Sequence, residues 1–145
     1  MMRSEIWTDG RKARWTVDVP TSRRERRRGL LGRAGLEVCA GLLLERCRSV
    51  HTIGMRFTID VVTLDGQLRV LRVCTLRPRR VLLPRPGVRH VLEVRADSGA
   101  RRGDRFRRVD QASATSDAAP ASVSRTSRTS SPGTEPRTRP AAARR

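Results

Sequence analysis

The sequence has few of the residues on which several common classes of protein depend. Its 145 residues include no tyrosine, two tryptophans, two phenylalanines and three cysteines. Cys39, Cys47 and Cys74 are odd in number and lack a C-x-x-C spacing, so we expect reduced thiols and not the disulfide framework of a small secreted protein. No apolar run approaches the roughly 18 residues that cross a bilayer, and the first residues resemble no signal peptide. These absences predict a soluble, cytoplasmic protein without a membrane span.

Acidic side chains are also scarce. The chain has 14 acidic against 32 basic residues, which gives a formal net charge of +18. Lys12 is the only lysine, so almost all of the positive charge is carried by arginine. Such a balance suits contact with polyanions, but it is equally typical of a solvated basic face.

The composition changes near the C-terminal end. Of the 34 residues from 112 to 145, 24 are Ser, Thr, Pro or Ala, and Val123 is the only sizeable apolar side chain. A segment with so little to bury cannot offset the ordering of its backbone, which costs about 1 to 2 kcal/mol per residue. We therefore expect one domain over residues 1–111 and a disordered tail over 112–145.

The pattern within residues 1–111 predicts a mainly β (α+β) domain, built as a small antiparallel sheet or half-open barrel with one or two short helices. Asp9-Gly10 and Asp65-Gly66 suit the tight turns of β-hairpins. Ser22 and Glu25 form a capping-box pattern, which predicts a helix running to about Leu31. Extended segments are expected at 4–8, 12–19, 42–44, two places within 50–64, 67–75, 81–83, 88–94 and 105–109.

Three stretches together resemble the bacterial and archaeal family called domain of unknown function 192. They are residues 25–33, residues 50–66, and residues 91–94 followed by 103–105. The resemblance covers roughly residues 5 to 109 and implies a compact, mainly antiparallel β domain with no established activity. Residues 95–102 are about four residues shorter than the family's usual helical turn at this place. Structural roles are expected for Gly54, Asp65, Gly66, Glu93, Gly103 and Asp104.

Asp60 stands out because it interrupts an apolar strand. An ionised carboxylate among Ile59, Val61 and Val62 is costly unless it accepts hydrogen bonds or pairs with a cation. We expect a structural clamp, with Asp60 accepting backbone amides of the 51–55 turn or pairing with a guanidinium such as Arg56. The alternative is a ligand-binding or general-base carboxylate, because perturbed carboxylates also gather at functional sites.

The segment from His51 to Asp60 is the best candidate for a site. A bend at Gly54 would bring His51 and Met55 to the rim of the sheet, where an imidazole can contact ligand. Each has a plainer interpretation, as a surface histidine and as a core-filling thioether. The ligand-binding candidates are His51, Met55, Arg56 and Asp60.

Two chemical interpretations of Cys47 are weaker. Cys47, His51 and Asp60 could form a nucleophile, base and orienting group, but a thiolate needs its base within hydrogen-bond reach. The Cys47-x-x-x-His51 spacing invites a zinc site, yet structural zinc usually takes four ligands. We therefore expect no metal, no cofactor and a buried free thiol, and the sequence carries no phosphate loop or hydrolase motif.

Arginine clusters give a second candidate interface. Grouped guanidiniums bind phosphate through a salt-sensitive counterion-release effect, although the aromatic side chains on which single strands stack are nearly absent. The candidates for weak polyanion binding are Arg23, Arg24, Arg26, Arg27, Arg28, Arg79 and Arg80.

Taken together, these patterns favour a non-catalytic binding or accessory module whose partner is an unknown small molecule or protein, with its site near residues 51–60. The alternatives are non-specific nucleic-acid or polyanion binding and an undescribed enzyme. An enzyme would need a concave pocket that joins His51, Asp60 and a third polar group.

Overall fold

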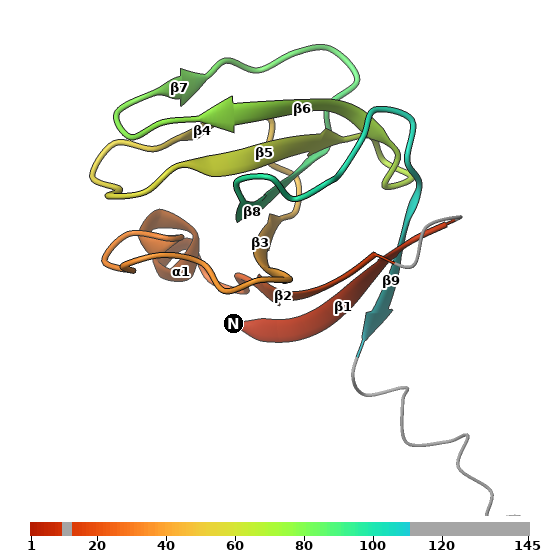
Figure 1. The fold of residues 1–145 in the computed structure, drawn as a ribbon, viewed down its shortest axis with the longest axis horizontal. Helices are drawn as coiled ribbons and strands as arrows, with labels where there is room; N and C mark the ends of the chain where they lie inside the picture. Colours follow the sequence, from red (N-terminus) through yellow and green to blue (C-terminus); the bar gives the residue numbers. More distant parts are fainter. Residues whose placement is uncertain (10–12, 111–145) are drawn as a thin grey trace, which may run out of the picture.

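The chain forms a curled β-sheet with one short helix. The structure, a computed structural model, describes residues 1–9 and 13–110. Seven strands form the main sheet in the order β6-β5-β8-β3-β2-β1-β9, and β4 pairs with β7 in a separate two-stranded sheet (Figure 1). The elements are β1 (Met2–Thr8), β2 (Arg14–Val19), α1 (Arg23–Arg28), β3 (Ala40–Leu44), β4 (Val50–His51), β5 (Ile59–Leu64), β6 (Val70–Leu76), β7 (Val81–Leu82), β8 (His90–Arg95) and β9 (Phe106–Asp110).

The strand pairing explains the curl of the sheet. All neighbours are antiparallel except β2 and β3, which are parallel because the connection through α1 crosses over one face of the sheet. The two edges of the sheet, at β6 and just before β9, approach each other. There the amide of Val70 donates to the carbonyl of Asp104 at 2.8 Å, and Arg69 forms an isolated bridge with Arg105. The sheet is therefore a half-barrel, and the predicted mainly β class is confirmed.

Apolar side chains pack on both faces of this sheet. β5 is buried along its whole length, and its residues alternate between two hydrophobic clusters. Val62 and Leu64 join the cluster that contains Trp15 and Phe106, whose ring centroids lie 5.4 Å apart. Ile59 and Val61 join the opposite cluster, which the helix segment and the β4–β7 pair cover. This second cluster is where the candidate site lies.

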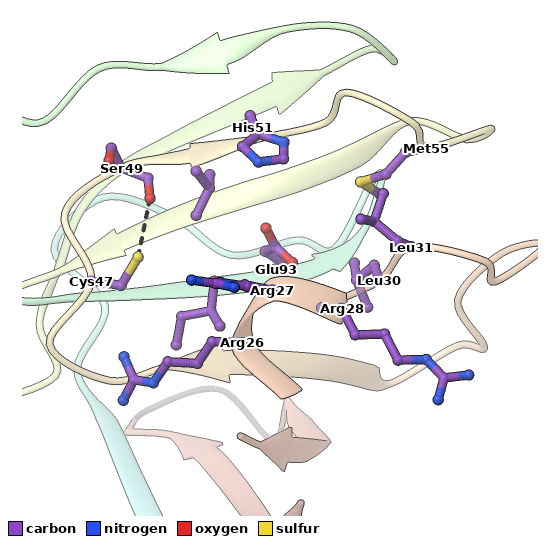
Figure 2. A pocket seen from close by; sticks show the side chains of 13 residues that line it. Arg26, Arg27, Arg28, Leu30, Leu31, Cys47, Ser49, His51, Met55 and Glu93 are labelled. Carbon is purple, nitrogen blue, oxygen red and sulfur yellow. Dashed lines mark hydrogen bonds between the residues drawn. The ribbon is translucent and has the colours of Figure 1, made fainter. Parts of the chain in front are cut away.

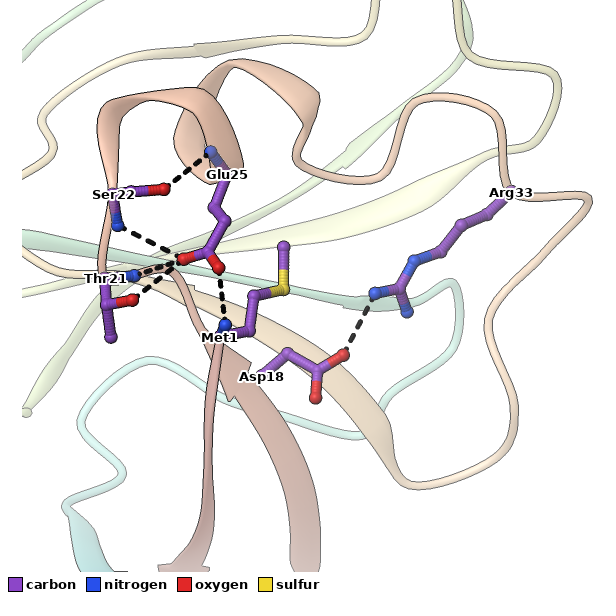
Figure 3. Close-up of polar contacts among 6 residues, drawn as sticks. All are labelled: Met1, Asp18, Thr21, Ser22, Glu25 and Arg33. Atoms are coloured by element: carbon purple, nitrogen blue, oxygen red, sulfur yellow. Dashed lines mark hydrogen bonds and ion pairs between the residues drawn. The ribbon is translucent and has the colours of Figure 1, made fainter.

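The N-terminus of α1 has the predicted capping box. The Ser22 hydroxyl accepts from the Glu25 amide at 3.2 Å, and the Glu25 carboxylate accepts from the amides of Ser22 and Thr21 (Figure 3). The amino group of Met1 also donates to Glu25 at 2.6 Å. The predicted end of the helix is wrong, because Gly29, with a φ of +46°, caps it after Arg28.

Several other predictions are confirmed in outline. β1 pairs with β2 and β5 with β6 as antiparallel hairpins, and Asp65 accepts the amides of Gln67 and Arg69 in the second turn. Residues 96–104 form two turns and a connecting loop without a helix, in line with the short segment noted in the sequence. The first hairpin turn at 10–12 and the predicted tail at 112–145 lie outside the described residues, and the expected boundary at 111 stays a prediction. Among residues 1–9 and 13–110, no helix is long and apolar enough to cross a membrane.

Candidate functional site

A cavity of about 270 Å³ opens between α1 and β4 (Figure 2). Its walls come from three parts of the chain: residues 26–31, residues 44–55 and Glu93 of β8. We call it the α1–β4 pocket. Leu30, Leu44, Val50 and Met55 make its walls largely apolar, and three arginines of α1 lie on its exposed side. Pockets with apolar walls and a few polar groups are the usual form of small-molecule sites.

Helix α1 and the turn after it form one wall of the pocket, the lower one in Figure 2. The capping box fixes the start of α1, and Gly29 reverses the chain directly after it. This turn directs Leu30 into the second hydrophobic cluster, where only 2% of its surface is exposed. The six-residue helix buries none of its own side chains, so Leu30 is its apolar anchor.

The upper wall depends on Thr52 and Gly54. Thr52 is fully buried, and its hydroxyl donates to the carbonyl of Arg77 at 2.6 Å and accepts from the amide of Arg80 at 2.9 Å. Gly54 has a φ of +85°, and a Cβ there would lie 3.1 Å from the side chain of Leu31. A side chain at this position would be strained by the backbone and crowded by its neighbour, so glycine allows the 51–55 loop to close over the pocket.

Glu93 occupies the centre of the pocket (Figure 2). It lies on β8 between Leu42 of β3 and Val61 of β5, and only 4% of its surface is exposed. Within the described part of the chain, its carboxylate has no hydrogen bond or ion pair. Burial therefore raises the pKa of Glu93 to about 7. Near neutral pH this group can both donate and accept a hydrogen bond.

Cys47 also lines the pocket, and its surroundings do not activate its thiol. Its thiol donates to the carbonyl of Ser49 at 3.0 Å. Burial raises the pKa of the Cys47 thiol, and the negative charge of Glu93 raises it further. The thiolate is the nucleophilic form, so this environment reduces the reactivity of Cys47 instead of activating it.

The structure separates the four ligand-binding candidates. His51 and Met55 both line the α1–β4 pocket, His51 as an exposed side chain and Met55 as a buried one. Arg56 is exposed and is not part of the lining. Asp60 also lies outside it. Of the four candidates predicted from sequence, His51 and Met55 thus line the pocket and the other two do not.

The expected partners of Asp60 are wrong. Its carboxylate accepts from the Thr75 hydroxyl at 2.7 Å and from both the amide and the hydroxyl of Ser98 at 3.0 Å. The reason is the alternation along β5, which puts Asp60 on the face of Val62 while Ile59 and Val61 face the cluster that contains Met55. The Asp60 carboxylate therefore joins β5 to β6 and to the loop after β8. None of its hydrogen bonds comes from the 51–55 turn.

The arginine candidates fall into two groups around the 51–55 loop. All five arginines of α1 are exposed, and the guanidinium of Arg26 donates to the carbonyl of Glu45 at 2.7 Å. Arg79 and Arg80 are exposed in the β6–β7 turn, whose backbone is hydrogen-bonded to Thr52. Positive charge therefore lies on both sides of this loop.

Sequence reasoning missed the position of Glu93 in the pocket. It treated Glu93 as structural, although the argument applied to Asp60 applies equally to an acid between Leu92 and Val94.

No cluster of side chains supports metal binding: across residues 1–9 and 13–110, no group of three or more His, Cys, Asp or Glu side chains could hold an ion.

Comparison with known proteins places the chain in a family. Residues 5–106 match the family model DUF192, described as "Uncharacterized ACR, COG1430". The chain belongs to this family. A curated relative, the UPF0127 protein PH1112 of Pyrococcus horikoshii, is 40% identical over 45 residues, which are 31% of this chain and 39% of the length of that relative.

Two crystal structures are similar to this DUF192 chain in fold. One is a protein of unknown function from Novosphingobium aromaticivorans DSM 12444, with a TM-score of 0.62 and 16% identity over 72% of this chain and 83% of that one. The other is a candidate transcription regulator from Sinorhizobium meliloti 1021, with a TM-score of 0.63 and 22% identity over 73% of this chain and 92% of that one. At these identities the likeness shows the fold alone.

Proposed function

We propose that this domain is a non-catalytic binding module that takes a small, largely apolar anion into the α1–β4 pocket. The observation that carries the proposal is the pocket itself, where apolar walls lie next to an exposed row of arginines. An apolar ligand body gains from leaving water, at about 25 cal/mol per Å² of buried surface. An anionic group gains from the field of the arginines, in a chain whose formal net charge is +18.

Catalysis at this pocket receives less support. The Cys47 thiol donates a hydrogen bond to a backbone carbonyl, and its raised pKa keeps it as a thiol. Asp60, the predicted orienting group for His51, has its hydrogen bonds with Thr75 and Ser98 instead. The nucleophile and the orienting group considered from sequence thus have other partners. A cytoplasmic location stays a prediction, for which the three free cysteines are the support.

The proposal is tested by thermal unfolding of the full chain with octanoate, a simple apolar anion. A ligand that binds only the native state raises the melting temperature by mass action. Val50→Phe should remove this rise because the larger ring projects into the pocket that Val50 lines. The matched control is Val88→Phe, at a buried position of the same hydrophobic cluster outside the lining. A concentration-dependent rise that survives Val50→Phe would contradict the proposal.

Polyanion binding is a second candidate, favoured by the two arginine groups on either side of the 51–55 loop. It is tested by the fluorescence anisotropy of a labelled oligonucleotide at about 50 mM and 200 mM salt, because counterion release makes phosphate binding strongly salt-dependent. Arg79→Ala with Arg80→Ala should weaken this binding, whereas Val50→Phe should not. Binding that is equally strong at both salt concentrations would count against an electrostatic interface.

A further inference from the structure

We propose that Glu93 is the specificity-determining residue of the α1–β4 pocket: its carboxyl group hydrogen-bonds to a hydroxyl or amide at the buried end of the ligand, while the ligand's anionic end lies among the arginines of α1. This inference rests on the proposed function and adds the chemical class of the ligand. It predicts a molecule with a negative charge at one end, an apolar middle and a neutral polar group at the other end.

The first support is the environment of the Glu93 side chain. β8 is an interior strand, and the neighbours of Glu93 in the sheet are Leu42 and Val61, neither of which can hydrogen-bond through its side chain. Its oxygens are accessible from the pocket, because no fully buried side-chain oxygen or nitrogen in the described part of the chain lacks a hydrogen-bond partner. A ligand that covers this carboxyl without hydrogen-bonding to it would leave a buried polar group unpaired, which costs about 1 to 3 kcal/mol. A ligand group that hydrogen-bonds to the carboxyl avoids that cost.

The second support is the set of charged and titratable groups that face Glu93. They are the arginines 26–28 from α1, Cys47 from the β3–β4 loop and His51 from β4. The Cys47 thiol is held by Ser49, and the arginines are exposed. All the cationic lining therefore belongs to the open side of the pocket, and the single acidic group belongs to its interior.

This arrangement orients the ligand and discriminates against cations. An amine would be attracted by ionised Glu93 but repelled by the three arginines that line the same pocket. An anion whose charge remains outside avoids the acid and contacts the arginines. Between the two ends, Leu30, Leu44 and Met55 offer apolar contact to the middle of the ligand.

The test uses three probes of similar length on the full chain: octanoate, 8-hydroxyoctanoate and 8-amino-1-octanol, measured by isothermal titration calorimetry. The hydroxyl should tighten binding about three- to tenfold over octanoate, as expected for one additional hydrogen bond. Glu93→Leu should abolish or reverse this preference, because the hydroxyl then has no partner, and Glu93→Gln should preserve it. Asp60→Asn is the matched control, a buried acid of the neighbouring strand outside the pocket, and should leave the preference unchanged.

The outcomes separate the two proposals. If octanoate binds and Val50→Phe blocks it, but the hydroxyl gives no advantage, the role of Glu93 is refuted and the binding module stands. If neither octanoate nor 8-hydroxyoctanoate binds, both proposals fail. Tighter binding of the amino alcohol than of the hydroxy acid refutes the predicted ligand class. Should Glu93→Leu not fold, the comparison of the two acids on the wild type still tests the proposal, because equal affinities of octanoate and 8-hydroxyoctanoate refute it.

Discussion

Replacing Glu93 by glutamine should change how the stability of the protein depends on pH. Glutamine has nearly the same shape and does not titrate, so the substitution removes the ionisation and little else. Burial raises the pKa of Glu93 from 4.5 to about 7 in the folded protein. A pKa difference of one unit corresponds to about 1.4 kcal/mol, so ionisation of Glu93 should cost the folded state about 3 kcal/mol.

The direction follows from the protons bound in each state. Between pH 4.5 and about 7 the unfolded chain has released the proton of Glu93 while the folded chain still holds it. The free energy of unfolding therefore falls as the pH rises through this window and is level, for this group, on either side. Glu25 contributes with the opposite sign at lower pH, because hydrogen bonds from the Met1 ammonium and Thr21 lower its pKa to about 2. Its contribution is the same in both proteins and cancels in the difference.

The assay is urea denaturation of the wild type and Glu93→Gln at pH values between about 4.5 and 8. The free energy of unfolding of the variant minus that of the wild type should increase by about 3 kcal/mol as the pH rises from about 4.5 to 8. Most of this increase should occur below pH 7. A difference that is constant with pH would refute the reasoning, because it would mean that the Glu93 carboxyl is solvated or paired in the folded protein.

Three further predictions concern single side chains. Asp60→Asn should lower the free energy of unfolding by about 1 to 3 kcal/mol, since an amide cannot accept every hydrogen bond of this carboxylate; an unchanged melting temperature would contradict the clamp. Gly54→Ala should destabilise by about 1 to 2 kcal/mol because of its positive φ and the contact with Leu31; the measurement is urea denaturation, and Gly66→Ala, at an exposed turn, is the comparison. Cys47 should react with a disulfide reagent more slowly than exposed Cys39 in single-cysteine variants at pH 8, because its pKa is raised; equal or faster reaction would show an activated thiol.

Local patterns in the sequence predicted most of the elements. The Asp65-Gly66 turn, the capping box at Ser22 and the alternating strands all depend on neighbours within a few residues, and the structure confirms them. The end of α1 differs from the prediction because Gly29 adopts a positive φ directly after Arg28 and ends the helix there. Nothing local specifies that β9 pairs with β1 or that β2 and β3 run parallel, since both depend on segments far apart in the sequence.

The site could be predicted only in part for the same reason. His51 and Met55 lie in one short segment and were found together. The pocket they line also needs the turn after α1 and an acid from β8, which no spacing in the sequence connects. Asp60 shows the converse: it is near His51 in sequence, yet the alternation of β5 sends its side chain to the opposite face of the sheet.

The most direct test of ligand binding in the α1–β4 pocket is a titration of 8-hydroxyoctanoate followed by NMR of ¹³C-labelled methionine methyl groups. The chain has three methionines, of which Met55 lines the pocket and Met1 and Met2 are exposed elsewhere. Binding in the pocket predicts a saturable shift of the Met55 signal, little change of the other two, and loss of the Met55 shift in Val50→Phe. A Met55 signal that stays fixed at saturating probe, or that moves no more than those of Met1 and Met2, would contradict it.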